Sequence, residues 1–348
     1  MTAPRLAVVG AGWWSANHHV PSLAAYDGAR LVALCDPQRE RAAELAERHG
    51  VAEVVTELAE LERVGVDGVL VATPHTTHHE LAAEALDRGW HVFVEKPLTT
   101  TAQDAADLVA RAERAGLQLA VGYTDQYTPA ARLVREAVQS DIGELVQVMA
   151  EFSSSTGGLF ARAEEAEPHA DDAPEDQHPE SYGAETGGGQ AQTQLTHVMG
   201  MVCWVTDRQV AEVAAFVDHR GQEVDVDDVA AFRLTGGGTG VVSSSGMAGP
   251  GRAERHAVRY LGTHGVVDQD MMSGRAVLRR SDGVDVTIAA AHEKPERTWQ
   301  PARTFADVVA GRADNPAPGR QAAAAAAFID AAITSARTRA FVEVPQVS

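Results

Sequence analysis

The chain has 348 residues, of which 45% are hydrophobic and 22% charged, a composition typical of a globular protein long enough for two domains. Its formal net charge of −20 would repel phosphate groups, which argues against nucleic acid or an anionic membrane surface as a partner. No apolar run approaches the roughly 20 residues of a membrane-spanning helix. The two cysteines, Cys35 and Cys203, lie in apolar stretches, and the first residues show no signal-peptide pattern. We therefore expect a cytoplasmic location.

Strand and helix patterns alternate over residues 1–122. Short apolar runs predict strands, whereas the Ala-, Glu- and Arg-rich stretches between them, such as residues 38–49 and 79–88, predict helices. The predicted strands are residues 6–9, 31–35, 68–72, 91–94 and 117–121. Such alternation is typical of parallel βαβ units with right-handed crossovers, so the first domain is predicted to be an α/β domain covering residues 1–122.

The pattern changes after residue 122. A helix is predicted over residues 129–139, and most of the strands that follow have no helices between them. These strands are residues 145–152, 210–216, 229–234, 240–244 and 257–261, before two late helices at 302–310 and 320–337. We expect residues 123–348 to form a second α/β domain with a large, mostly antiparallel open sheet that is covered on one face.

Residues 153–186 are polar, acidic and rich in Gly, Pro and Ser. Seven carboxylates gather there: Glu164, Glu165, Glu167, Asp171, Asp172, Glu175 and Asp176. The segment can be interpreted as a solvated loop, or as a mobile flap near an active site, because long loops in compact domains are often lids.

A glycine-rich segment, Gly10-Ala11-Gly12-Trp13-Trp14-Ser15, follows the first predicted strand and opens a helix. The first glycine permits a tight turn, and the second lets the backbone approach a pyrophosphate at a positive helix N-terminus. Ser15 stands where a third Gly or Ala is usual, and it is still small enough for close packing. Since a strand precedes the motif and a helix follows it, the segment predicts a Rossmann dinucleotide site.

Asp36 ends the second predicted strand, where a carboxylate accepts hydrogen bonds from ribose hydroxyls and repels a 2′-phosphate. This position favours NAD as the cofactor, with NADP the less favoured alternative. Arg39 and Arg41 lie close in sequence and could reduce the repulsion, although they fit equally well as exposed helix residues.

Two further motifs support a family resemblance. Ala72-Thr73-Pro74-His75-Thr76-Thr77-His78 follows one strand of the first domain, and Glu95-Lys96-Pro97 follows the next. Gly187-Gly188-Gly189 and His197 come later, before Asn315-Pro316-Ala317-Pro318-Gly319. With the glycine turn, these motifs resemble the glucose–fructose oxidoreductase / inositol dehydrogenase / rhizopine catabolism (GFO/IDH/MocA) family over nearly the whole chain.

The resemblance implies a Rossmann domain followed by an open-sheet α/β domain, with homodimers or homotetramers formed by sheet packing. It also implies oxidation or reduction of a secondary alcohol on a sugar, cyclitol or related polyol, and a cis Lys96–Pro97 bond. The residues that we expect at the cofactor are Gly10, Ala11, Gly12, Trp13, Trp14, Asp36, Thr73, Pro74, His75, His78, Glu95, Lys96 and Gln126.

Lys96 and His197 are the predicted catalytic residues. The lysine would donate a hydrogen bond to the substrate oxygen, and the histidine, with a reference pKa of about 6.5, would accept the hydroxyl proton. The predicted substrate-binding residues are Lys96, Tyr123, Gln190, Thr193, Gln194 and His197, of which the last four are spaced to share one helical face.

The chain departs from the family pattern at three positions. Many members carry an aspartate four residues before the histidine, but this chain has Thr193, which cannot stabilise an imidazolium as a carboxylate would. The family often has Asn and Arg where Thr124 and Gln126 stand, and the absence of that arginine favours a substrate with a neutral head group.

Fourteen histidines raise the question of a metal, but apart from residues 75–79 none lies near a compact ligand cluster or a thiolate. We therefore expect no metal site.

Three functions remain open from the residues. The chain could be a dehydrogenase that releases its cofactor after each turnover. It could instead hold NAD tightly and use it transiently, oxidising a glycoside at ring C3 so that a bond is eliminated or a sugar is epimerised. It could also be an NAD-binding sensor without catalysis, an alternative that Lys96 and His197 oppose and Thr193 keeps open.

Overall fold

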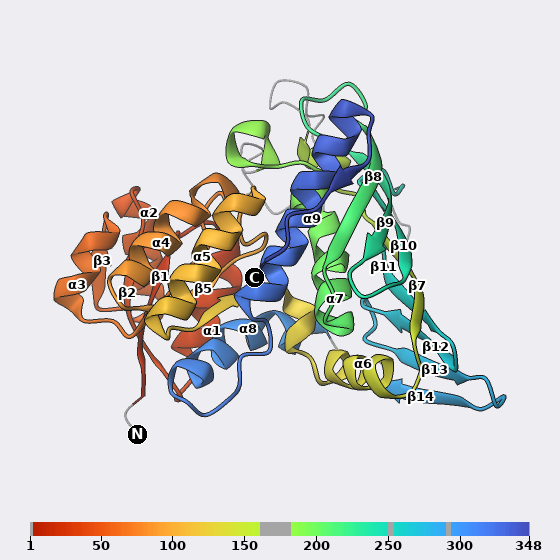
Figure 1. Cartoon of the computed structure of the whole chain (residues 1–348). Helices are drawn as coiled ribbons and strands as arrows, with labels where there is room; N and C mark the ends of the chain where they lie inside the picture. The colour runs from red at the N-terminus through yellow and green to blue at the C-terminus, as the bar shows by residue number, and fades with distance from the viewer. Residues whose placement is uncertain (1–2, 161–181, 250–253, 290–293, 348) are drawn as a thin grey trace. The chain divides into compact units, whose positions relative to one another are not determined.

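The computed structural model describes residues 3–160, 182–249, 254–289 and 294–347. The chain forms two compact units, which Figure 1 shows in ribbon form. The first unit comprises Met1–Thr99, Asp104–Tyr127 and Lys294–Arg320; the second comprises Thr100–Gln103, Thr128–Glu293 and Gln321–Ser348. The boundary predicted at residue 122 stays a prediction. Residues 161–181, with the carboxylates of the predicted flap, lie outside the described residues.

The first unit contains a six-stranded parallel sheet in the order β3-β2-β1-β4-β5-β6. This is the doubly wound order of a Rossmann domain. The strands are β1 (Arg5–Val9), β2 (Arg30–Cys35), β3 (Glu53–Val55), β4 (Gly68–Val71), β5 (His91–Val94) and β6 (Leu119–Val121). The α-helices are α1 (Val20–Ala24), α2 (Arg39–His49), α3 (Leu61–Val64), α4 (His78–Asp87), α5 (Ala102–Ala115, whose first two residues are grouped with the second unit) and α8 (Lys294–Val309). Every residue of β4 is buried, as expected for a parallel strand covered on both faces.

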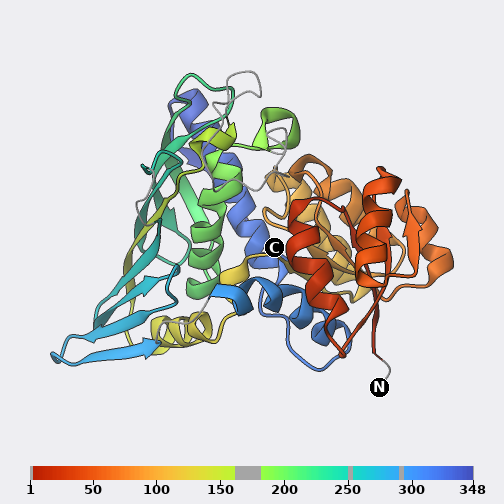
Figure 2. The ribbon, with the colours of Figure 1, turned by 180° about the vertical axis from the view of Figure 1, so that it is seen from behind.

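Helix α8 belongs to the first unit although it lies far along the sequence. It lies beside α1 in the view of Figure 2, and Phe305 joins the core that contains Leu6 and Phe93. Tyr26, after α1, donates its hydroxyl hydrogen to the carboxylate of Asp307, whose two oxygens lie 2.8 and 2.9 Å away. The hydrophobic core of the dinucleotide domain is therefore completed by a late segment of the chain.

The second unit contains a nine-stranded sheet, as far as the chain is described, in the order β14-β13-β12-β11-β7-β10-β9-β8-β15. Strands β7 and β10 pair in parallel, and all the other neighbours are antiparallel. The strands are β7 (Leu145–Ser153), β8 (Val210–Asp218), β9 (Asp227–Leu234), β10 (Thr239–Ser245), β11 (Arg255–Gly262), β12 (Gly265–Asp270), β13 (Ala276–Arg280), β14 (Asp285–Ala289) and β15 (Val342–Glu343).

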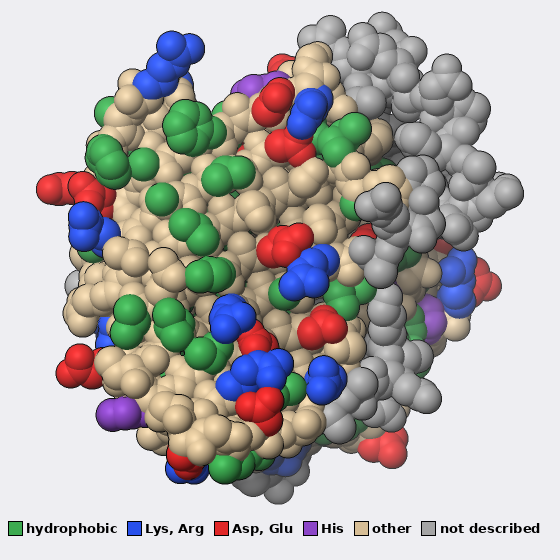
Figure 3. Space-filling model, turned by 90° about the vertical axis from the view of Figure 1, so that its right-hand side faces the viewer, with side chains coloured by type: hydrophobic (Ala, Val, Ile, Leu, Met, Phe, Trp, Pro, Cys, Tyr) green, Lys and Arg blue, Asp and Glu red, His purple; other side chains and the backbone are tan. Residues whose placement is uncertain are grey.

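Helices cover one face of this sheet, namely α6 (Pro129–Ser140), α7 (Thr196–Thr206) and α9 (Gly319–Thr338) (Figure 1). Residues of β9 alternate between buried and exposed, as a strand with one covered face requires. On the covered face, Phe232 of β9 packs edge-on against Phe328 of α9. Figure 3 views the open face, over which hydrophobic side chains are scattered among charged ones. No helix of the described residues combines the length and apolar character needed to span a membrane.

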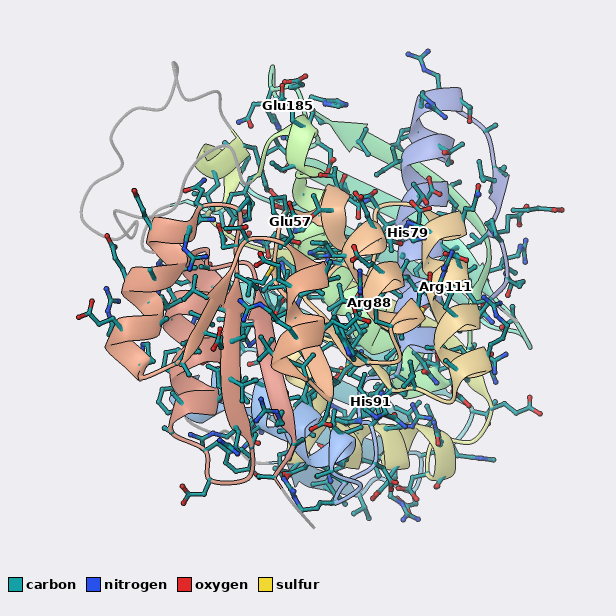
Figure 4. The ribbon with its side chains drawn as sticks, turned by 90° about the vertical axis from the view of Figure 1, so that its left-hand side faces the viewer. Glu57, His79, Arg88, His91, Arg111 and Glu185 are labelled. Atoms are coloured by element: carbon teal, nitrogen blue, oxygen red, sulfur yellow. The ribbon has the colours of Figure 1, made fainter. Side chains whose placement is uncertain are left out.

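An ion-pair network ties α4 to α5 on the surface of the first unit. His79 Nε2 lies 2.9 Å from an Asp107 carboxylate oxygen, which also accepts a hydrogen bond from Arg111 Nε at 2.7 Å. Figure 4 labels His79 and Arg111 on these two helices. His79 is therefore engaged by a carboxylate partner.

Candidate active site

The turn after β1 has the shape that the glycine motif predicts. Gly10 has a φ of +95°, and a Cβ there would lie 2.3 Å from the carbonyl oxygen of Ala72, so only glycine fits. A Cβ on Gly12 would meet nothing within 4 Å, which leaves open space beside the backbone. The chain then continues through a π-helical turn, Ser15–His19, into α1. The turn can thus admit a phosphate-bearing ligand close to its backbone.

Asp36 fixes this turn from the end of β2. Its Oδ2 accepts hydrogen bonds from the Ala11 backbone N–H at 2.7 Å and from Arg41 Nη2 at 2.8 Å, and its Oδ1 accepts one from the Gln38 N–H. The side chain is buried. Since each carboxylate oxygen accepts about two hydrogen bonds, one acceptor position remains on Oδ1. The contact with the glycine turn is a function of Asp36 that sequence reasoning missed.

Several polar atoms beside the glycine turn lack partners within the described part of the chain. They are Trp14 Nε1, Ser15 Oγ and His18 Nδ1, all buried at the atom. The His18 ring lies 4.2 Å from that of Trp14, and its burial lowers the pKa of His18, an effect that His19 reinforces and Glu95 opposes. Buried polar groups normally have a partner, so these atoms fit a site that receives a polar ligand.

The loop after β4 is held from behind by His78. One ring nitrogen lies 2.8 Å from the carbonyl oxygen of Pro97, and the other lies 2.9 Å from that of Thr73. Burial lowers the pKa of His78, although both carbonyls favour its protonated form. A neutral imidazole can donate to only one carbonyl at a time. The fully buried His78 therefore connects the Thr73 loop to the loop after β5, while His75 is partly exposed and Pro74 is exposed.

Lys96 follows β5 in a turn organised by Glu95. The Lys96–Pro97 bond is cis, which confirms the expectation from the family resemblance. Glu95 Oε2 accepts a hydrogen bond from the Lys96 N–H at 3.1 Å, and its Oε1 lies 2.8 Å from His19 Nε2. A Cβ on Gly122 would approach this carboxylate to 2.6 Å, so the glycine makes room for it.

The environment of this turn shifts the pKa of both side chains. Burial lowers the pKa of the Lys96 ammonium, although Glu95 opposes the shift. Burial alone would raise the pKa of Glu95, but His19 and Lys96 outweigh it and hold that pKa below its usual range. His19 was missed at the sequence level, where nothing distinguished it from the adjacent His18.

After β6, Tyr123 immediately precedes the turn Thr124–Tyr127, and Gln126 lies within it. Both side chains are buried in the first unit. Their strand ends at the same edge of the sheet as β1, β2, β4 and β5, because all six strands are parallel. The predicted cofactor residues therefore gather at the carboxyl edge of the sheet, where open α/β sheets bind ligands.

In the second unit, a glycine triplet leads into the helix that carries His197. A Cβ on Gly188 would clash with the Tyr182 carbonyl, and Gly189 has a φ of +101° with Asp225 beside it. Asp225 accepts hydrogen bonds from the backbone N–H groups of Gln190 and Ala191, the latter to its carboxylate at 2.6 Å. This carboxylate holds the start of the helix in place.

The four predicted substrate residues of this helix do not share one exposed face. Residues 191–195 form a π-helical turn, which adds a residue to the turn and rotates Gln190 relative to His197. Gln190 is fully buried, with its amide bonded to Ser244 and Thr156, and Thr193 donates its hydroxyl hydrogen to the Gly189 carbonyl at 2.6 Å. Gln194 and His197 are partly exposed.

Two buried carboxyl groups lie near the start of the same helix. Asp228 of β9 is buried, and apart from the neighbouring carboxyl of Asp225 its oxygens have no hydrogen-bond partner among the described residues. Burial raises the pKa of Asp228 well above its usual range, and Asp225 adds to the shift. Burial likewise raises the pKa of Asp225. The two groups can therefore share a proton.

No group of three or more His, Cys, Asp or Glu side chains within the described ranges is arranged to hold a metal ion. Both cysteines are free and buried, and burial raises the pKa of each thiol to about 12. Of the other histidines in the sequence, His169, His178 and His292 lie outside the described residues.

Comparisons with known proteins agree with this architecture. Residues 131–268 match the GFO/IDH/MocA C-terminal domain. Among solved structures, an NAD-binding oxidoreductase from Klebsiella pneumoniae has a TM-score of 0.80 at 21% identity and covers 99% of this chain and 100% of that one. A levoglucosan dehydrogenase in complex with NADH and levoglucosan has a TM-score of 0.78 at 19% identity, with 99% and 100% covered. At these identities the likeness shows the fold.

Curated relatives match over only part of this chain and part of their own lengths. The scyllo-inositol 2-dehydrogenase (NAD(+)) of Bacillus subtilis (strain 168) is 30% identical over 168 residues, which cover 45% of this chain and 49% of the relative. The D-glucoside 3-dehydrogenase of Escherichia coli (strain K12) is 31% identical over 166 residues, with 46% and 47% covered. The matched region thus spans about half the length of these relatives. Residues 4–123 match the family's oxidoreductase domain with an NAD-binding Rossmann fold, so that both domain matches together show that the chain belongs to the GFO/IDH/MocA family of oxidoreductases.

Proposed function

We propose that the chain is an NAD-dependent oxidoreductase that transfers a hydride between the nicotinamide and a secondary alcohol or ketone of a sugar, cyclitol or glycoside. The observation that carries the proposal is the turn at Glu95 and Lys96. It holds a lysine of lowered pKa at the carboxyl edge of a Rossmann sheet, the edge at which the glycine turn also lies.

The cofactor fits the residues at this edge. The backbone at Gly10–Gly12 would receive the pyrophosphate, and the unpartnered atoms of Trp14, Ser15 and His18 offer polar contacts. The remaining acceptor position of Asp36 suits a ribose hydroxyl, and its negative charge disfavours a 2′-phosphate, which supports NAD over NADP. Bound there, NAD would supply the hydride acceptor for oxidation of the alcohol.

Lys96 would contact the reacting oxygen. Its ammonium donates a hydrogen bond and favours the negative charge that develops on that oxygen as the hydroxyl loses its proton. Because its pKa is lowered, the Lys96 ammonium holds its own proton less tightly than an exposed lysine does. Glu95 and His19 keep the turn in position from behind.

His197 would accept the hydroxyl proton during oxidation and return it during reduction. Its ring is partly exposed on α7, and a histidine titrates near neutral pH. Gln194, one turn earlier and also partly exposed, offers an amide for a ring hydroxyl, whereas the buried Gln190 and Thr193 support the helix. A neutral polyol suits these contacts, and the named relatives act on an inositol and a glucoside.

The open face of the second sheet is proposed to bind a second copy of the chain, giving a homodimer or homotetramer. Exposed apolar side chains lie on neighbouring strands of this face, where Phe216 pairs with Val229 and Val241 pairs with Met149. Exposed apolar side chains that neighbour one another on adjacent strands are a feature of interaction surfaces.

The test is a screen of the purified protein with NAD and NADP against sugars, cyclitols and glycosides, following the absorbance of the reduced nicotinamide. We expect turnover with NAD, which falls by at least about 100-fold in Lys96→Met and in His197→Asn. Lys294→Met changes the only other lysine of the sequence and serves as the matched control. Unimpaired turnover in the Lys96 and His197 variants would refute the site assignment.

Two other results would select the alternative functions. Conversion of a glycoside without net change in nicotinamide absorbance, by protein that retains NAD through purification, would show that the cofactor is used transiently. Binding of NAD without conversion of any compound in the screen would favour the sensor.

A further inference from the structure

The ring of His197 does not stand alone in the second unit. Phe152 of β7 lies with its ring centroid 5.7 Å from that of His197, and the two planes differ by only 20°. The same phenyl ring lies 3.6 Å from the imidazole of His256, at 18°. Phe152 and His256 are direct partners across β7 and β11, so the sheet itself fixes their stacking.

This arrangement comes from two rigid elements. Phe152 is only 2% exposed, on the helix-covered face of the sheet, and α7 packs against β7 and β11 on that face. Thr193, one turn before His197, has its hydroxyl hydrogen bonded to the Gly189 carbonyl, and a threonine carries no charge that could stabilise an imidazolium. Phe152 therefore gives His197 an aromatic support.

From this geometry we infer that Phe152, backed by His256, is a positioning residue for His197, orienting its imidazole and stabilising its protonated form. The inference rests on the proton-transfer role proposed above for His197. An aromatic face within about 6 Å attracts a cation through the ring quadrupole, and near-parallel offset rings at about 4.5–7 Å are a favourable aromatic geometry.

Charged groups on the neighbouring strands have partners of their own. Glu151 of β7 pairs with Arg255 of β11 at 2.7 Å, and on β12 Asp268 pairs with Arg279 at 2.9 Å. Asp270 accepts hydrogen bonds from residues of its own turn, and burial raises the pKa of the Cys203 thiol on α7 to about 12, which keeps it neutral. His256 is the titratable group that shares the phenyl ring with His197, so a charge on one imidazole disfavours a charge on the other.

The test follows the titration of His197 directly by NMR of histidine-labelled full-length protein, with the His197 signal identified by its loss in His197→Asn. Phe152→Leu removes the ring and keeps an apolar side chain. We expect the proton affinity of His197 to fall by roughly two- to fivefold, so that its titration midpoint moves to lower pH. His256→Phe keeps a stacked ring without a second charge, and here the midpoint should rise or keep its wild-type value, with a single titration step.

Activity gives a second measurement on the same variants. In Phe152→Leu, kcat should fall more than KM rises, and the acid limb of the kcat/KM profile should move to lower pH, whereas a merely structural role would leave that limb in place. His256→Phe should retain the wild-type kcat within about threefold, since it preserves the stack.

The inference is overturned if Phe152→Leu folds and leaves the His197 midpoint unchanged. Should Phe152→Leu fail to fold, His256→Leu is compared with His256→Phe in the same titration, because both lack the second charge and only the phenylalanine keeps the outer ring of the stack. A lower His197 midpoint in His256→Leu than in His256→Phe supports the inference, and equal midpoints overturn it. The NMR titration needs no substrate and therefore tests the role of Phe152 independently of the proposed function. An active His197→Asn enzyme would refute His197 as the proton acceptor but would leave the role of Phe152 to the titration. An inactive His197→Asn with an unshifted Phe152→Leu would refute the stack alone.

Discussion

His19 Nε2 lies 2.8 Å from Glu95 Oε1, and this contact joins the helical segment after the glycine turn to the loop that carries Lys96. Both side chains are buried. One contact between buried side chains therefore connects the proposed phosphate-binding turn to the proposed catalytic turn within the first unit.

Removal of His19 is expected to destabilise the protein strongly. His19→Leu would remove the partner of Glu95 Oε1 and leave the carboxylate with the Lys96 N–H and the nearby Lys96 charge. An unsatisfied buried acceptor typically costs about 1–3 kcal/mol in the free energy of unfolding. Denaturant unfolding at pH 7 measures the loss. In the Glu95→Gln background the same substitution should cost much less, because no charge remains to be neutralised, and an equal cost in both backgrounds would contradict the pairing.

The pair should also shape the response to acid. The pKa of Glu95 is lowered in the folded state, so its stabilising contribution is present above the pKa of an unfolded glutamate, about 4.3, and is lost as the pH falls through the lower folded value. Glu95→Gln should therefore flatten the decline of stability in acid.

Lys96 is expected to react with acetic anhydride at lower pH than an ordinary lysine does. Because burial lowers its pKa, its amine loses the proton at a pH below about 10.4. The rate of acetylation, followed by mass spectrometry of the two lysine-containing peptides, should rise with a midpoint below that of Lys294. The midpoint does not depend on how accessible each amine is, and equal midpoints would show that the pKa of Lys96 is not lowered.

Asp36→Ser should shift the cofactor preference from NAD toward NADP. The substitution removes a charge that opposes a 2′-phosphate and frees Arg41, which in the native protein donates to Asp36. Loss of a charged hydrogen bond predicts a roughly tenfold or greater rise in Kd for NAD, measured by quenching of tryptophan fluorescence. Arg39→Ala is the control, since Arg39 donates to the Val54 carbonyl and, among the described residues, makes no hydrogen bond to Asp36. A wild type that already prefers NADP would refute the interpretation of Asp36.

Asp228→Asn is expected to stabilise the protein at neutral pH. Above about pH 4 the unfolded chain has lost the proton of this carboxyl, whereas the folded state, in which the pKa of Asp228 is raised, still binds it. The free energy of unfolding therefore falls as the pH rises from about 4 to the pKa of Asp228 in the folded state. The amide keeps a hydrogen-bonding group without a charge, which should add on the order of 1 kcal/mol at pH 7. Thermal unfolding across pH 4–8 tests this, with the exposed Asp218→Asn as control.

Phe216→Glu should reduce the oligomeric state measured by light scattering after size exclusion. Phe216 is 79% exposed on the open face, and a charge there would oppose burial against a second copy. Leu133→Glu places the same charge at an exposed leucine of α6, away from that face, and should leave the oligomer intact. An unchanged mass for Phe216→Glu would contradict the proposed interface.

The sequence predicts elements well where local patterns and tertiary burial agree. The runs at residues 31–35 and 91–94 are strands in the structure, and the helix predicted at 129–139 is α6. Weaker patterns escaped prediction. Strand β14, Asp285–Ala289, lies mostly exposed at the edge of its sheet, so burial does not select an apolar pattern there.

Part of the candidate site could also be predicted from local sequence patterns. Gly10 and Lys96 are set by local backbone geometry and by motif, which a sequence displays. His19, Phe152 and Asp225 act through partners that are distant in the chain, and the π-helical turn at residues 191–195 changed the face on which Gln190 lies. Contacts between distant segments depend on the fold and leave no local signal.

The late return of α8 to the first unit has a consequence for synthesis. Ala302, Phe305 and Ala306 complete the core of a domain whose sheet ends at Val121. A ribosome adds roughly 5–20 residues per second, so the glycine turn and its strands must wait, partly uncovered, until this helix has emerged. We expect a nascent chain halted before Lys294 to remain open to proteases and chaperones, and the dinucleotide domain to mature only as the last helices leave the ribosome.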